Sequence, residues 1–198
     1  MKDGYKTAGL FGGALLAAGI AHAQPQFDLI DLPGYEISAY AYDRVMFAYG
    51  YGYAESGTLS YSFANASASG TLTPTFVSVE TSVGPAGTLN YAPASVYTEF
   101  TVSEATVGRA AWDLNRSDDD ISLPQLRLFD VTNNAFLFNL GAPDGDAGTQ
   151  DFNLVPGILY SLEISNFSLG GGSTNSLSFA AIPAPASAAP AISGCRFA

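Results

Sequence analysis

The sequence has few of the side chains that catalyse reactions or cross-link a chain. Among its 198 residues there is one cysteine, Cys195, and one histidine, His22. A single cysteine excludes an intrachain disulfide, and a single histidine excludes a zinc site built from several histidines. We recognise no catalytic motif and no cofactor-binding motif. The sequence alone therefore says more about location and fold than about activity.

Charged residues are also scarce, at 13% of the chain, and most of them are acidic. Seven Lys and Arg residues against 18 Asp and Glu residues give a formal net charge of −11. Nucleic-acid binding needs clustered basic residues that neutralise phosphates, so the acidic excess argues against a nucleic-acid partner. The apolar fraction of 47% is sufficient for a packed core.

The N-terminus has the layout of a secretory signal peptide over residues 1–23. Lys2 and Lys6 give it a positive start, and residues 8–20 form an apolar run rich in Ala, Gly and Leu. This run is shorter than the roughly 20 residues that a membrane-spanning helix needs. We therefore predict an exported protein with a cleaved signal peptide; an uncleaved N-terminal anchor is the alternative.

The predicted cleavage site follows Ala23, because Ala21-His22-Ala23 matches the small-x-small pattern read by signal peptidases. The mature protein would then begin at Gln24, without either lysine and without the histidine. The usual general base and the usual amine nucleophile would both be missing. This favours a protein without catalytic activity.

Beyond Gln24 the apolar residues have the two-residue period of β-strands. Apolar and polar side chains alternate over residues 95–103 and 158–165, and apolar residues again take every second position over 176–181. Such alternation places one face of each strand on a core and the other in water. A tyrosine-rich segment at 35–53 also predicts two strands, whereas the small, polar segment 64–70 fits either a flat strand or a loop.

Turn-forming residues separate the predicted strands at short intervals. Thr132-Asn133-Asn134 lies between two apolar segments and predicts a hairpin, and Val155-Pro156-Gly157 suits a type II turn. Many short strands with frequent turns are typical of an antiparallel sandwich. We predict an all-β protein: one antiparallel β-sandwich, jelly-roll-like domain over residues 24–182.

The C-terminal segment Ile182-Pro183-Ala184-Pro185-Ala186-Ser187 follows a predicted last strand. This ending resembles the junction of bacterial PEP-CTERM exported proteins, in which a strand runs into a Val/Ile-Pro-Glu-Pro motif. The resemblance implies export, handling by a sorting enzyme (an exosortase) and a place at the cell surface or in a biofilm matrix.

The resemblance is incomplete in this tail. Ala184 stands where the family has Glu, and residues 188–198 are too short to span a bilayer and contain Pro190. Residues 183–198 are therefore expected to be a disordered, Pro/Ala-rich remnant of a sorting signal, with Pro183 and Pro185 as its processing residues.

One candidate cation site lies in the acidic segment 144–151. Asp144, Asp146 and Asp151 surround glycines, and Ca²⁺ prefers several oxygen ligands of this kind. The segment lacks the full ligand pattern of an EF-hand loop, and an acidic hairpin turn is the alternative interpretation.

A candidate carbohydrate-binding surface comes from the aromatic residues Tyr49, Tyr51, Tyr53 and Trp112. Flat rings with polar tips can stack on sugars, although Tyr and Trp are also ordinary strand residues. The predicted partner is an extracellular polysaccharide.

Three functions remain open at this point. The first is a non-catalytic surface or matrix protein, and the second is a carbohydrate-binding module. The third is a secreted glycan hydrolase using two of Glu99, Glu104 and Asp113, for which the two carboxylates must face one cleft at a fixed separation.

Overall fold

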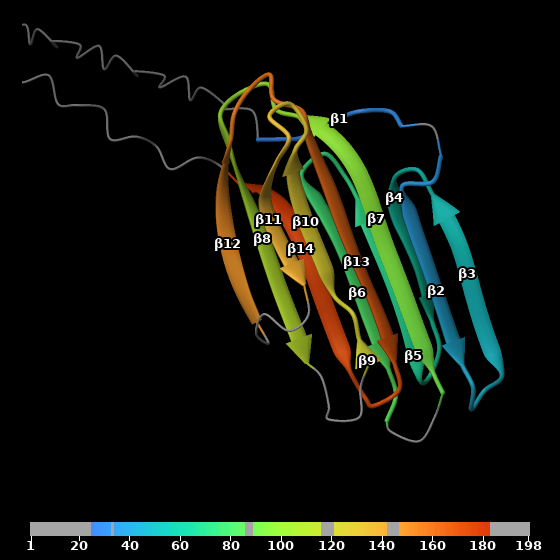
Figure 1. Cartoon of the computed structure of the whole chain (residues 1–198). Helices are drawn as coiled ribbons and strands as arrows, with labels where there is room; N and C mark the ends of the chain where they lie inside the picture. The colour runs from blue at the N-terminus through green and yellow to red at the C-terminus, as the bar shows by residue number, and fades with distance from the viewer. Residues whose placement is uncertain (1–24, 33, 86–88, 116–120, 142–146, 183–198) are drawn as a thin grey trace, which may run out of the picture.

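A computed structural model describes residues 25–32, 34–85, 89–115, 121–141 and 147–182. It is an all-β sandwich of two antiparallel sheets, which confirms the predicted fold class (Figure 1). Within these residues there is no helix long and apolar enough to cross a membrane. The predicted signal peptide, with Ala21, Ala23 and Gln24, and the tail with Pro183 and Pro185 lie outside the described residues.

The eight-stranded sheet has the order β11-β10-β13-β7-β2-β3, with β1 pairing with β7 and β9 pairing with β13. Its strands are β1 (Asp28–Leu29), β2 (Ile37–Asp43), β3 (Ala48–Ala54), β7 (Tyr91–Thr101), β9 (Ile121–Ser122), β10 (Gln125–Asp130), β11 (Ala135–Gly141) and β13 (Tyr160–Leu169).

The six-stranded sheet has the order β12-β8-β14-β6-β5-β4. Its strands are β4 (Gly57–Ser62), β5 (Ala66–Leu72), β6 (Phe76–Val83), β8 (Thr106–Asn115), β12 (Ala147–Leu154) and β14 (Thr174–Ile182).

Alternating side chains fill the space between the sheets. In β13, every second residue from Tyr160 onward is buried, as the period-two pattern predicted. Phe27, Phe100 and Phe179 meet at the centre, with ring centroids 4.6 to 6.2 Å apart. All three are at most 1% exposed, so they bring large apolar areas into one core.

A cluster of polar side chains also bridges the two sheets. Its members are buried and hydrogen bond with one another at 2.5 to 3.1 Å. We call them the inter-sheet polar cluster: Thr81, Ser122, Asn166, Ser168 and Asn175. Buried polar groups are costly without partners, and most of these groups find theirs across the two sheets, so the network favours this alignment of the sheets.

The predicted turns form as expected. Asn134 adopts φ +53° between β10 and β11, and the Asp130 carboxylate accepts a hydrogen bond from Asn133 N at 2.8 Å. Gly157 has φ +81°, the conformation needed at the third position of a type II turn. The segment 64–70, undecided from sequence, contributes most of β5.

Candidate functional site

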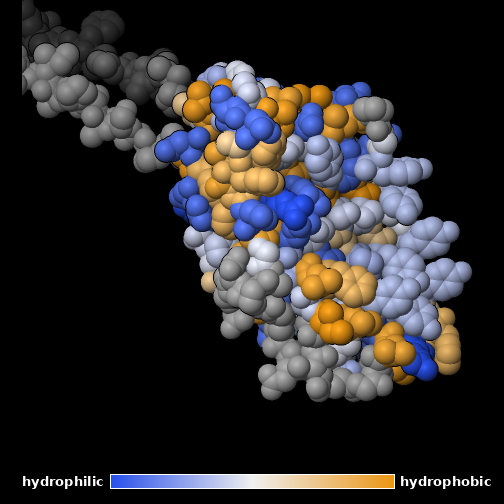
Figure 2. Space-filling model, viewed as in Figure 1, coloured by the Kyte–Doolittle hydropathy of each residue, from blue (hydrophilic) through white to orange (hydrophobic). Residues whose placement is uncertain are grey.

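The most distinctive surface is the outer face of the eight-stranded sheet, the side that faces away from the six-stranded sheet. Tyr49, Tyr51 and Tyr53 of β3 lie there and are 64%, 61% and 57% exposed. The register of β2 and β3 places Tyr40 beside Tyr51 and Tyr42 beside Tyr49. Figure 2 shows pale side chains projecting over the margin that β2 and β3 form in Figure 1.

The glycines of β3 explain why its tyrosines all point outward. Gly50 and Gly52 alternate with the tyrosines, so they face the six-stranded sheet and lie on the ring of Tyr61 from β4. A Cβ at Gly50 would lie under 3.0 Å from Tyr61 Cδ1, and a Cβ at Gly52 would lie under 3.0 Å from Tyr61 Oη. The Tyr-Gly repeat therefore exposes tyrosine rings on the outer face of β3 and leaves room for the Tyr61 ring on its inner face.

The tyrosine rings stack across neighbouring strands. Tyr40 and Tyr91 have ring centroids 5.0 Å apart and nearly parallel planes, and Tyr40 and Tyr51 are 6.3 Å apart. The hydroxyls of Tyr40 and Tyr91 form a hydrogen bond, with 3.1 Å between the two Oη atoms. This hydrogen bond, together with partial burial, favours the protonated phenol of Tyr40 and raises its pKa to about 12.

These rings border an open groove of about 510 Å³. Its lining contains tyrosine rings, a proline and small residues, and no charged side chain: Ser38, Ala39, Tyr40, Tyr51, Gly52, Tyr53, Tyr91 and Pro93. The hydroxyls of Ser38 and Ser95 hydrogen bond at 2.7 Å beside it. We call this the tyrosine groove.

The tyrosine groove continues across the strands of the sheet. Ser38 and Pro93 also border a second hollow of about 520 Å³, which reaches Gln125, Ser165 and Phe167 on β10 and β13.

A third hollow of about 510 Å³ lies on the same face and is charged. Its lining includes Tyr97 and Phe136, as well as Arg127 and Glu163, which pair at 3.4 Å. Tyr97 Oη donates a hydrogen bond to Glu99 Oε1 at 3.0 Å. The outer face thus changes from neutral and aromatic at β3 to mixed charge toward β11.

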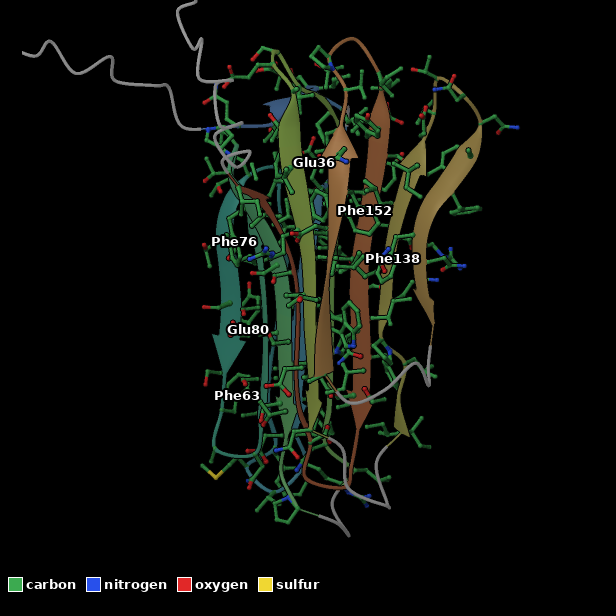
Figure 3. The ribbon with its side chains drawn as sticks, turned by 90° about the vertical axis from the view of Figure 1, so that its left-hand side faces the viewer. Glu36, Phe63, Phe76, Glu80, Phe138 and Phe152 are labelled. Carbon is green, nitrogen blue, oxygen red and sulfur yellow. The ribbon has the colours of Figure 1, made fainter. Side chains whose placement is uncertain are left out.

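Trp112 does not join the tyrosines. It lies on β8 of the other sheet, and its indole packs against Phe138 with 5.7 Å between ring centroids. Phe138 in turn packs against Phe152, with 5.4 Å between the two ring centroids (Figure 3). The prediction that Trp112 shares a surface with Tyr49, Tyr51 and Tyr53 is corrected on this ground.

Of the three aspartates in the candidate cation site, the structure describes only Asp151. Asp144 and Asp146 lie outside the described residues. Asp151, on β12, accepts hydrogen bonds from Arg109 Nε at 2.7 Å and Arg109 Nη2 at 2.8 Å, which lower the pKa of its carboxyl. Calcium would have to displace that guanidinium. Among the described residues, no three His, Cys, Asp or Glu side chains are grouped as metal ligands.

The carboxylates considered for hydrolysis come from three different elements. Glu99 lies on the outer face of the eight-stranded sheet in β7, whereas Asp113 is exposed on β8 of the six-stranded sheet. Glu104 is in the connection between those strands. Glu99 and Asp113 thus lie on different sheets, and Glu99 faces away from the six-stranded sheet.

Ser38, Tyr91 and Pro93 are lining residues that the sequence did not single out. Tyr91 is 38 or more positions from every tyrosine of β3 in the chain, and only the pairing of β2 with β7 brings it near them. The signal that could have found it is the alternation of Tyr91-Ala92-Pro93-Ala94-Ser95, which places Tyr91, Pro93 and Ser95 on one face.

Comparison with known proteins gives no family. No protein-family model matches the sequence, and no curated protein matches it. One similar solved structure is the enzymatically active domain of tailspike protein 4 from bacteriophage CBA120, with a TM-score of 0.31 and 14% identity. That match covers 63% of this chain and 19% of the tailspike chain.

Proposed function

We propose that the protein is an exported, non-catalytic protein of the cell surface or extracellular matrix that binds polysaccharide through the tyrosine groove. The observation that carries this proposal is the grouping of Tyr40, Tyr51, Tyr53 and Tyr91 around one open, uncharged groove. Flat ring faces suit the C–H faces of sugars, and the neighbouring phenol and serine hydroxyls offer hydrogen bonds.

The charge pattern favours a neutral glycan. No Lys, Arg, Asp or Glu lines the tyrosine groove, and the chain carries a formal net charge of −11. A polyanionic glycan would meet overall repulsion with no basic residue to pair with it in the groove.

The shape favours an internal stretch of a chain over a chain end. The groove is open, and the hollows on this face lie between β3 and β11, which are five strand spacings apart. At about 4.8 Å per spacing this is a path of about 24 Å, long enough for several sugar units.

Export and surface location rest on the sequence at the two ends. The signal-peptide layout of residues 1–23 and the PEP-CTERM-like junction at 182–187 both support them. The absence of catalysis is supported by the separate positions of Glu99 and Asp113 on the two sheets.

The test is binding to a panel of neutral and acidic polysaccharides, measured by affinity electrophoresis and calorimetry. Tyr51→Ala and Tyr53→Ala are expected to weaken binding to a neutral glycan about 2- to 10-fold each, the range for an aromatic contact. Phe76→Ala is the matched control, because Phe76 is an aromatic residue of the other sheet that is 41% exposed.

Loss of binding in the tyrosine variants with retention in Phe76→Ala supports the proposal. Equal losses in all three variants, or no binding to any glycan of the panel, would contradict it. Release of soluble products from a glycan, abolished by a single Asp or Glu substitution, would instead make the protein a hydrolase.

A further inference from the structure

Strand β3 is an unprotected edge of the eight-stranded sheet. Among the described residues it pairs only with β2, in an unbroken register from Ile37–Ala54 to Asp43–Ala48 (Figure 1). Backbone N–H and C=O groups on its other side therefore face outward without a strand partner. Such an edge is a template for another strand.

Two of the other three edge strands carry protective features, and β3 carries none. The pairing of β11 with β10 is interrupted by a register shift between Leu128 and Phe129. Strand β12 carries Asp151 in an ion pair with Arg109. In contrast, β3 has no charged residue, no proline and no bulge over its seven residues. Proteins commonly use charge, proline or bulges to prevent edge pairing.

The sequence of β3 is symmetric. Ala48–Ala54 reads Ala-Tyr-Gly-Tyr-Gly-Tyr-Ala in both directions, with Tyr51 at its centre. In an antiparallel pair of two identical strands centred on Tyr51, Tyr49 would lie opposite the second copy's Tyr53. A two-fold contact requires this kind of self-complementarity, because the same patch serves both sides. The fourth edge strand, β4, is also uncharged, but its sequence Gly-Thr-Leu-Ser-Tyr-Ser has no such symmetry.

We propose that β3 pairs edge to edge with β3 of a second copy of this chain, antiparallel about Tyr51, which joins the two eight-stranded sheets into one. The proposal does not depend on glycan binding.

The surroundings of β3 fit this pairing. The exposed tyrosine rings would form cross-strand aromatic pairs on the outer face, where such pairs stabilise a sheet. On the inner face Gly50 and Gly52 carry no side chain, and the Tyr61 ring of the same chain lies against them. Exposed Arg44 precedes β3 and exposed Glu55 follows it, so the antiparallel arrangement brings opposite charges to each end.

The first test is the concentration dependence of mass, measured by sedimentation equilibrium on the purified protein. The unmodified protein is expected to be a dimer. Tyr51→Lys is expected to raise the dimer dissociation constant at least tenfold, because the central pair of Tyr51 rings is lost and two like charges would lie directly opposite at the two-fold axis. Phe136→Lys is the matched control, since Phe136 is 62% exposed at the opposite edge and Tyr51 is 61% exposed.

A dimer weakened by Tyr51→Lys and unaffected by Phe136→Lys supports the proposal. A monomer at all concentrations, or an equal effect of both substitutions, would overturn it.

A second test uses cross-linking and does not depend on the stability of the lysine variant. In a Cys195→Ser background, Tyr51→Cys places two thiols across the two-fold axis at a spacing that a disulfide can bridge. Rapid oxidation to a covalent dimer is expected for Tyr51→Cys and not for Phe136→Cys. Equal rates for the two variants would overturn the proposed interface.

Discussion

The contact between β3 and Tyr61 predicts that alanine is tolerated differently at the two glycines of β3. Neither Gly50 nor Gly52 has a positive φ, so alanine suits both backbones. The obstacles differ, because a Cβ at Gly50 would meet the base of the Tyr61 ring, whereas a Cβ at Gly52 would meet the terminal Oη. Tyr61→Phe removes only the second of these atoms, and it leaves the ring Cζ 3.3 Å from a Cβ at Gly52.

The magnitudes follow from two opposing effects. Replacing glycine by alanine in a strand stabilises the fold by about 0.5–1 kcal/mol, because the unfolded chain loses freedom. Overpacking a filled space costs about 1–3 kcal/mol. Gly50→Ala is therefore expected to be net destabilising both with the native Tyr61 and in a Tyr61→Phe background. Once Tyr61→Phe removes the hydroxyl, Gly52→Ala is expected to lose most of its overpacking cost, which leaves a net stabilisation below about 1 kcal/mol.

Urea unfolding followed by circular dichroism gives the free energy of unfolding of each variant and the coupling between sites. Gly141→Ala is the control, because a Cβ there would have no heavy atom within 4 Å. The reasoning would be refuted if Gly50→Ala were stabilising. It would also be refuted if Tyr61→Phe rescued Gly50→Ala as fully as Gly52→Ala.

Two further predictions concern the buried polar groups. Burial opposes ionisation of Asp43, but hydrogen bonds from Met46 N and Asn65 outweigh it and lower the pKa of the Asp43 carboxyl. The ionised carboxylate therefore stabilises the fold at pH values above the ordinary Asp range. This stabilisation is lost as the pH falls through the lowered pKa. Unfolding of Asp43→Asn, measured from pH 7 to pH 2, should depend less on pH than that of the unmodified protein; an unchanged pH dependence would contradict this. Asn166→Ala should lower the free energy of unfolding by about 1–3 kcal/mol for each partner of the inter-sheet polar cluster that it leaves unsatisfied. Urea unfolding measures this loss, and Asn153→Ala is the control, because Asn153 is exposed and its replacement should have little effect.

The sequence predicted the strands whose two faces differ most in polarity. Residues 95–103 and 158–165 alternate strongly, and they correspond to β7 and β13 at the centre of the sheet. The segment 64–70 showed no such signal, because Ala66, Ala68 and Gly70 are small on the buried face. The structure supplies the reason: a Cβ at Gly70 would be 2.6 Å from Ile37 Cγ2 of the opposite sheet.

The candidate site was only partly predictable. The Tyr-Gly repeat of β3 placed Tyr49, Tyr51 and Tyr53 on one face, since side chains alternate along any strand. The sequence did not show which sheet each strand joins. Trp112 was predicted to lie on the site but does not, because β8 belongs to the six-stranded sheet. Tyr91 was not predicted but lines the tyrosine groove, because β7 lies next to β2.

The position of β14 affects how the chain reaches its fold. This strand is the last in sequence among the described residues, yet it lies inside the six-stranded sheet and pairs with both β6 and β8. Until residues 174–182 are synthesised, β6 with β5 and β8 with β12 lack the strand that joins them into one sheet. Because β14 is the last of these strands to be made, the six-stranded sheet stays incomplete during most of synthesis, and its distant pairings are of the kind that form slowly. Completion of the fold thus depends on its last strand, so a chain ending before Thr174 would leave two new open edges.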